Sequence, residues 1–133
     1  MKTDLAPKSL YYYNLFVWAL GLIGIGVVHQ YTMDHALKSS ELTPFIITSV
    51  FGTIMMLGIA FTLNKCRYIT INPTDEKKFI IGNIFTNTHG HTDKLTIVKK
   101  VWPNLFKINF EGKNYFILSF DNTVDEYRQR MNR

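Results

Sequence analysis

Two long segments without charge constrain the fold of this chain more than any other feature of its sequence. No Asp, Glu, Lys or Arg occurs in residues 9–33 or 42–64. Within these gaps, residues 11–29 and 45–63 are nearly all apolar. A helix of that length spans roughly 28 Å, close to the ~30 Å hydrocarbon core of a bilayer, and a soluble helix of this length normally keeps a polar face. We therefore predict two transmembrane helices, at about 11–29 and 45–63.

The charged residues are segregated along the chain. Residues 1–64 hold three basic and three acidic side chains, so the net charge of +5 comes entirely from residues 65–133. The single cysteine excludes an intrachain disulfide framework, and the composition is neither that of an acidic disordered chain nor that of a collagen-like repeat. The sequence thus predicts a neutral membrane hairpin, residues 1–64, followed by a basic domain, residues 65–133.

The positions of the basic residues predict how the hairpin is oriented. The connection 30–43 is short and polar, so the two helices run antiparallel. The flanking basic residues are Lys2 and Lys8 before the first helix, Lys38 in the connection, and Lys65, Arg67, Lys77 and Lys78 after the second helix. The positive-inside rule then places both termini in the cytoplasm and the loop 30–43 outside. We expect an integral protein of the inner or plasma membrane.

Residues 65–133 alternate between short β-prone segments and turns. The predicted strands are residues 67–72, 78–85, 95–101, 104–110 and 115–120. In the fourth, Phe106, Ile108 and Phe110 share one face, and Lys107 and Asn109 share the other. A small antiparallel β domain of about five or more strands follows from this pattern.

Polar segments and a terminal helix complete the predicted domain. Residues 87–93 are polar and include Gly90, which indicates a loop, and residues 111–114 are typical of a hairpin turn. Thr123 and Glu126 have the spacing of a capping box, which predicts a helix beginning there. Val124, Tyr127 and Met131 would share one face of that helix.

These elements, in this order, resemble small bacterial membrane proteins that carry a pleckstrin-homology-like (PH-like) domain behind a transmembrane hairpin. The residues that carry the resemblance are Arg67-Tyr68-Ile69-Thr70, Phe79-Ile80-Ile81-Gly82, the strand 94–101, the hairpin 106–120 and the closing helix. The resemblance implies a strongly bent antiparallel sheet capped by the helix, and a scaffold or binding module rather than a catalyst. A full PH barrel has seven strands, so either the barrel is incomplete or residues 86–93 supply another strand.

Residue types that usually carry chemistry are sparse. His89 and His91 offer two imidazoles, whereas zinc takes three or four ligands, and Cys66 has no partner for a nucleophilic dyad. His29 is interpreted as an interfacial histidine, because the second helix has none to face it. No phosphate-binding loop, nucleophile elbow or zinc-binding HExxH motif occurs. We therefore expect no enzyme, no catalytic residue, no metal or cofactor, and no nucleic-acid partner.

Two sets of residues are candidate contact sites. Small side chains that reduce bulk at membrane depth are Gly21, Gly24, Ser49, Gly52 and Thr53. They either pack the hairpin together or dock it onto another membrane protein, and the sequence leaves both open. The candidate contacts for anionic lipid headgroups are Lys65, Arg67, Lys77 and Lys78, each worth about 1 kcal/mol near such a surface. Membrane topology alone would also account for these basic residues.

The sequence therefore predicts a non-catalytic membrane scaffold or adaptor. Its cytoplasmic domain would bind a partner protein or assemble with copies of itself, and membrane lipids would be a further contact. The alternative is a small accessory subunit of a larger membrane complex that docks through its glycine-rich hairpin.

Overall fold

The computed structural model describes every residue except 1–3, 73, 76 and 133. The chain forms two compact units, one of residues Tyr13–Phe61 and one of Met1–Tyr12 together with Thr62–Arg133. The N-terminal segment thus belongs to the same compact unit as the β domain, although it lies within the predicted hairpin region, residues 1–64. Lys2, which contributed to the predicted orientation, lies outside the described residues.

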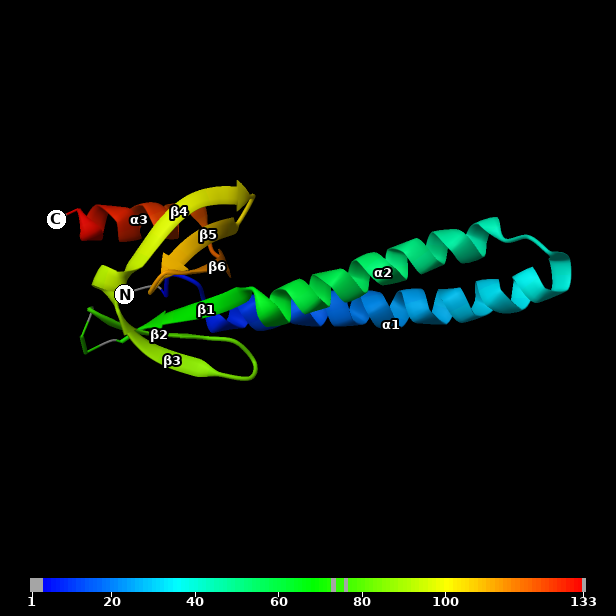
Figure 1. The fold of residues 1–133 in the computed structure, drawn as a ribbon, viewed down its shortest axis with the longest axis horizontal. Helices are drawn as coiled ribbons and strands as arrows, with labels where there is room; N and C mark the ends of the chain where they lie inside the picture. The colour runs from blue at the N-terminus through cyan, green and yellow to red at the C-terminus, as the bar shows by residue number, and fades with distance from the viewer. Residues whose placement is uncertain (1–3, 73, 76, 133) are drawn as a thin grey trace. The chain divides into compact units, whose positions relative to one another are not determined.

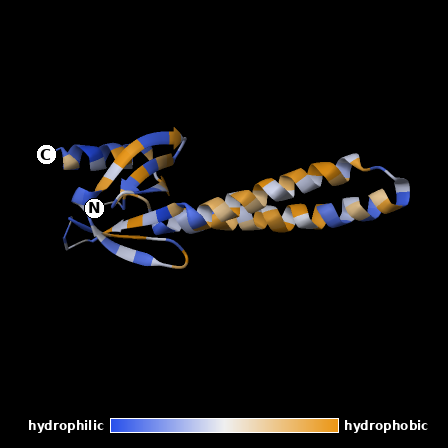
Figure 2. Cartoon of the chain, in the orientation of Figure 1, coloured by the Kyte–Doolittle hydropathy of each residue, from blue (hydrophilic) through white to orange (hydrophobic). Residues whose placement is uncertain are grey.

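The helical part of the chain consists of α1 (Lys8–Ser39) and α2 (Thr43–Asn64). By length and composition both helices are long and apolar enough to cross a membrane, and Figure 2 shows apolar residues along both. The predicted loop 30–43 is wrong for residues 30–39, which continue α1 and leave only 40–42 as the connection. Polar residues there mark the end of the apolar segment, but they do not interrupt the helical backbone. The helix stops at Ser40, whose φ of 61° is left-handed.

Six strands form the β domain, which Figure 1 shows together with α3. They are β1 (Cys66–Ile71), β2 (Lys78–Gly82), β3 (Asn87–His91), β4 (Leu95–Trp102), β5 (Leu105–Phe110) and β6 (Lys113–Leu118). Their order in the sheet is β3-β2-β1-β6-β5-β4. Every neighbouring pair is antiparallel except β1 with β6, which is parallel. The predicted β domain is confirmed, but a purely antiparallel sheet is wrong.

The additional strand, β3, is the segment predicted as a loop from its polarity and from Gly90. Gly90 pairs with Phe79 of β2 and faces the core, where a Cβ atom would lie 2.6 Å from Cζ of Phe110. Glycine is needed there because Phe110 fills the space, and not because the chain turns. His89 and His91 are exposed on the opposite face, which explains why the segment reads as polar.

The tight turns of the sheet contain the residue types that their backbone conformations favour. Residues 111–112 join β5 to β6 with positive φ at both Glu111 (51°) and Gly112 (81°), so the predicted hairpin turn is confirmed. Such turns match the twist of the flanking strands. Between β4 and β5, Asn104 takes a φ of 62° directly after Pro103. Proline followed by a left-handed asparagine is typical of a type II turn.

The N-terminal segment completes the middle of the sheet. β1 and β6 share only two register pairs, Cys66 with Phe116 and Arg67 with Ile117. Further along β1, the backbones of Ala6 and Ile69 exchange hydrogen bonds of 3.3 and 2.8 Å. Residues 4–6 therefore take the place beside β1 that β6 leaves.

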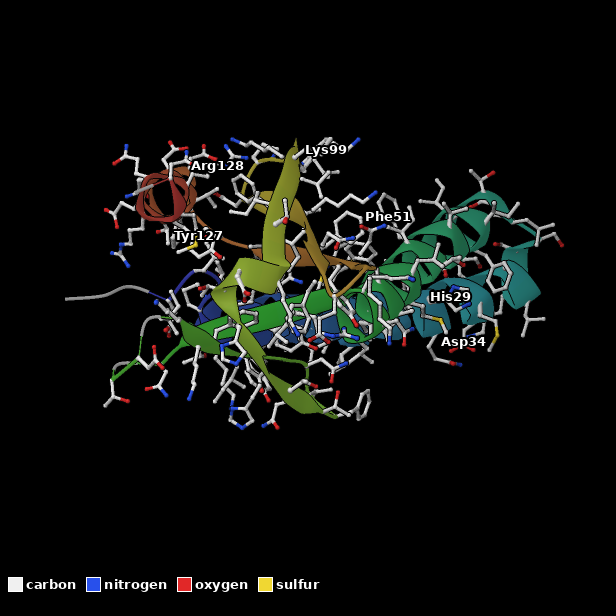
Figure 3. The ribbon with its side chains drawn as sticks, turned by 60° about the vertical axis from the view of Figure 1, so that its left-hand side comes forward. His29, Asp34, Phe51, Lys99, Tyr127 and Arg128 are labelled. Carbon is white, nitrogen blue, oxygen red and sulfur yellow. The ribbon has the colours of Figure 1, made fainter. Side chains whose placement is uncertain are left out.

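The core of the β domain lies between the sheet and α3 (Asp121–Met131). Its buried residues are Leu5, Ala6, Ile69, Phe79, Ile81, Leu95, Phe106, Ile108, Phe110, Ile117, Val124 and Tyr127. The predicted inward face of β5 is thus confirmed. Figure 3 labels Tyr127, which is buried, and Arg128 beside it, which is exposed.

The start of α3 differs from the prediction. The helix begins two residues before Thr123, the N-cap is Phe120, and no side chain caps it, so the capping box is wrong. Asp121 in the first turn suits the helix dipole and forms an ion pair of 2.7 Å with Lys100. Val124 and Tyr127 are buried as predicted, but Met131 is 47% exposed.

Candidate binding edge and groove

The two outer strands of the sheet differ in how well they could accept another strand. β4 has irregular register between Ile97 and Lys99 and again between Lys100 and Trp102. Bulges and lysines are features that protect natural edge strands from pairing. β3 has neither, because it pairs with β2 at five consecutive positions and contains no charged residue. Among the described strands, β3 is the regular and unprotected edge.

The hydrogen bonds beside β3 show which backbone groups reach its free edge. Asn83 N donates to Thr86 O (2.8 Å), and Thr92 N donates to Lys77 O (2.9 Å), in the same register as β2 and β3. Hydrogen-bonded pairs alternate in an antiparallel ladder, so Thr88 and Gly90 bond to β2. The N–H and C=O groups of residues 87, 89 and 91 therefore point toward the free edge.

An open groove of about 520 Å³ lies against the outer face of β1, β2 and β3. The register aligns Thr70 with Ile80 and His89 across the three strands, and Lys78 with His91 in the next row. These five side chains share one face, since residues two apart on a strand point the same way. The residues lining the groove include one lysine and two histidines and no carboxylate. The groove thus combines an apolar centre at Ile80 with hydrogen-bond donors and positive charge.

The structure offers little for metal binding or nucleophilic chemistry. No group of three or more His, Cys, Asp or Glu that could hold a metal occurs among the described residues. Cys66 is buried beside Tyr11, Tyr68 and Phe116. Burial raises the pKa of the Cys66 thiol to about 12, so it stays protonated at neutral pH.

The four basic residues predicted to contact lipid do not form one site. Lys65 and Arg67 lie at the start of β1. Lys78 lies at the far end of β1, because its neighbour Phe79 pairs with Ile71, the last residue of that strand. Six residues of strand separate these ends by roughly 20 Å. Lys77 lies beside Lys78, whose Nζ is 3.9 Å from the Asp75 carboxylate.

The guanidinium of Arg67 is already engaged within the domain. It donates to the carbonyls of Asn64 (3.1 Å) and Cys66 (2.8 Å) and lies over the ring of Tyr115 at 4.7 Å. Arg67 therefore holds the junction between α2 and β1 together, and Lys65 is the exposed cation beside it.

The small residues of the hairpin have different surroundings. A Cβ atom at Gly21 would lie 2.9 Å from Sδ of Met55, so this glycine allows α2 to approach. At Gly52 the nearest atom, Cγ2 of Ile25, is 3.9 Å away, and at Gly24 nothing lies within 4 Å. Gly21 thus contributes to packing between α1 and α2, and Gly24 does not.

The two hydroxyl residues among the predicted small side chains, Ser49 and Thr53, bond within their own helix. Ser49 donates to the carbonyl of Phe45 (2.8 Å), and Thr53 donates to that of Ser49 (2.9 Å). Neither hydroxyl therefore needs a partner on another helix.

Two contacts between the helices were missed from the sequence. A Cβ atom at Gly58 would lie 2.5 Å from the ring of Trp18, a closer approach than at any predicted glycine of the hairpin. His29 Nδ1 is 2.7 Å from Oγ1 of Thr48, and Oγ1 of Thr32 is 3.1 Å from the same hydroxyl. The signal was present: an isolated glycine in one apolar segment with a tryptophan in the other, and polar residues near both ends of the connection.

No protein-family profile matches the chain, and no curated protein or solved structure shows significant similarity to it. We therefore infer its function from the geometry of the chain alone.

Proposed function

We propose that this chain is a non-catalytic adaptor of a bacterial inner membrane, whose cytoplasmic β domain binds an extended segment of a partner protein. The observation that carries the proposal is the regular, unprotected edge of β3 beside the groove on the outer face of β1–β3. The β domain would be a PH-like module, in which the segment 86–93 supplies the additional strand β3.

The partner would bind as an additional strand. Its main chain would pair with the outward N–H and C=O groups of residues 87, 89 and 91, and this pairing supplies affinity that is independent of sequence. Every second side chain of the partner strand would lie over the groove. There, Lys78, His89 and His91 favour partner side chains with carboxylate or hydroxyl groups. Anchoring both proteins in one membrane raises their effective concentration, so a weak strand contact suffices.

The helices support a membrane location, and the segments that flank them support one membrane side for both the start of α1 and the end of α2. Large apolar side chains are exposed along α1 and α2, which suits lipid better than water. Residues 4–12 pack in the same unit as the β domain, so the segment before α1 and the domain after α2 lie together. Lys8, Lys65 and Arg67 flank the helices there, and the positive-inside rule favours the cytoplasm for that side.

A proline at the centre of β3 tests the strand-addition proposal. The His89→Pro variant of the full chain removes one outward N–H group without removing a bond between β2 and β3. His89→Ala is the matched control, because it changes the same side chain and keeps the donor. We expect the native partner to co-purify in mild detergent with His89→Ala and to be lost with His89→Pro. Equal recovery with both variants would refute the proposal.

Amide hydrogen exchange separates a partner protein from a second copy of this chain. In the purified protein, the outward amides of residues 87, 89 and 91 should exchange quickly, and addition of the partner should protect them. Protection that instead rises with the concentration of the purified chain would identify self-assembly through β3.

A second candidate function is favoured by the surroundings of two glycines in α1. Gly24 and Gly26 have no atom within 4 Å of a built Cβ, so α2 does not use the space beside them. Another membrane helix could approach closely there, as expected for an accessory subunit. Gly24→Leu would then abolish co-purification of the partner, and His89→Pro would leave it unchanged. The opposite pattern is expected if β3 carries the function.

A further inference from the structure

The loop between β2 and β3 exposes two large apolar side chains. Ile84 is 45% exposed and Phe85 is 72% exposed. The loop is nevertheless tightly built, because Oδ1 of Asn83 accepts hydrogen bonds from the amides of Phe85 (3.0 Å) and Thr86 (2.9 Å). Tight turns of this length usually carry polar residues at the tip. An ordered loop that presents isoleucine and phenylalanine therefore needs an apolar environment.

The same loop is bound to the ends of both long helices. Nδ2 of Asn83 donates to the carbonyl of Leu63 in the last turn of α2 (2.9 Å). The amide of Ile84 donates to the hydroxyl of Tyr11 in α1 (3.4 Å), and this hydroxyl in turn donates to the carbonyl of Thr62 (3.4 Å). All these residues belong to one compact unit. The loop is thereby fixed beside the residues at which the apolar spans begin and end.

The surroundings of the loop match a membrane interface. Residues 79–92 contain no Asp, Glu, Lys or Arg. Beside the loop, Tyr11 makes edge-to-face contacts with Tyr12 and Tyr68, and Nζ of Lys8 lies 5.9 and 5.2 Å from the centres of those two rings. Tyrosines and lysines are the residues that gather where hydrocarbon meets headgroups.

We propose that Ile84 and Phe85 insert into the lipid bilayer, at the boundary between headgroups and acyl chains, as a third point of membrane contact beside α1 and α2. The proposal rests on the membrane anchoring proposed above. Lipid is the expected occupant because the loop is continuous, through Asn83 and Tyr11, with the ends of the apolar spans. The loop would hold the β domain in one orientation on the membrane surface and leave the β3 edge free for a partner.

Site-directed spin labelling of the full chain in vesicles of phosphatidylcholine and phosphatidylglycerol tests this proposal. Labels are placed at Phe85→Cys in the loop, at Thr74→Cys in the exposed turn at the opposite end of β2, and at Leu57→Cys within α2. Cys66 is buried and does not compete for the label. Relaxation by oxygen, which concentrates in lipid, is compared with relaxation by a water-soluble nickel chelate.

We expect the label at position 85 to resemble that at position 57, with strong relaxation by oxygen and weak relaxation by nickel, and the label at position 74 to show the reverse. If position 57 reports lipid while position 85 behaves like position 74, the loop is in water and this inference fails alone. If position 85 is shielded from both reagents, protein covers the loop and the inference is again wrong. If position 57 also reports water, the membrane anchoring itself fails.

Discussion

The side-chain hydroxyl of Ser119 donates a hydrogen bond to the backbone carbonyl of Leu5, which lies 114 residues earlier in the chain. Both residues are buried, and Ala6 next to Leu5 pairs with Ile69 of β1. Asp4 adds a further bond, because its Oδ1 accepts from the amide of Ile71 at 3.2 Å. The chain is therefore held by β1 and by Ser119, which directly follows β6, immediately before α1 begins.

Removing this hydroxyl should destabilise the β domain. Ser119→Ala leaves a buried carbonyl without its side-chain donor, a change that costs about 1–3 kcal/mol. The loss would appear as a lower midpoint of thermal unfolding of the full chain in detergent, followed by near-ultraviolet circular dichroism. Thr96→Ala, at an exposed position of β4, is the control and should leave the midpoint nearly unchanged. An equal effect of both variants would contradict a special role for Ser119.

Gly90 should not tolerate even one added carbon. In Gly90→Ala the new Cβ would lie 2.6 Å from Cζ of Phe110 and 2.9 Å from Cζ of Phe79, so the ring pair must move. Overpacking of this kind costs about 1–3 kcal/mol. Denaturant unfolding of the β domain measures the loss. Gly24→Ala, whose Cβ would meet no atom within 4 Å, should cause no loss, and a stable Gly90→Ala would show that the rings adjust freely.

Cys66 should be inert while the chain is folded. With its pKa raised to about 12 by burial, only about one thiol in 10⁴ is ionised at pH 8. A thiol reagent should therefore modify Cys66 roughly a thousand-fold more slowly in the folded protein than after denaturation. Phe85→Cys supplies an exposed thiol in the same chain as the positive control. Rapid modification of folded Cys66 would mean that β1 opens readily in the folded protein.

Alkaline pH should weaken the β domain in a defined window. Burial raises the pKa of Cys66 from 9.0 and that of Tyr127 from 10.0, each to about 12. The folded state holds these protons more tightly than the unfolded chain does, so their stabilising effect is complete below pH 9 and is lost between pH 9 and 12. Unfolding midpoints measured across this window should fall as the pH rises.

Two variants separate the contributions to this pH dependence. Tyr127→Phe should remove the part of the decline between pH 10 and 12, and Cys66→Ala should remove the part that begins near pH 9. A decline that is unchanged in both test variants would assign it to other groups.

Sequence patterns identified the elements whose determinants are local. The alternation of Phe106, Ile108 and Phe110 predicted the inward face of β5, and Glu111-Gly112 predicted the turn that follows it. The two charge-free segments likewise predicted the cores of α1 and α2. In each case the residues that fix the structure are close neighbours in the chain.

Features that depend on distant contacts were not predictable in the same way. Gly90 looks like a loop residue until Phe110, on another strand, is known to occupy the space beside it. β1 pairs in parallel with β6 at one end and with the N-terminal segment further along. The N-terminal segment has no strand pattern in its sequence, so this arrangement was not predictable. The polarity of residues 30–39 predicts the end of the first helix near residue 29, but these residues continue α1 to Ser39.

The candidate binding edge shows the same division. The sequence pattern places His89 and His91 in a polar loop, whereas the structure places them in β3. Only the strand order makes their segment the outermost strand of the sheet, and only the register directs their backbone groups outward. Similarly, Lys77 and Lys78 follow α2 closely in the sequence, but β1 separates them from Lys65 and Arg67 in the structure.

The bond between Ser119 and Leu5 also sets an order of events during synthesis. At about 5–20 residues per second, a ribosome needs roughly 6 to 23 s to make the 114 residues that separate the two positions. Both apolar segments emerge during that interval, while the residues before α1 still lack their place in the sheet. Both apolar segments are therefore made before the β domain can close around its own first residues.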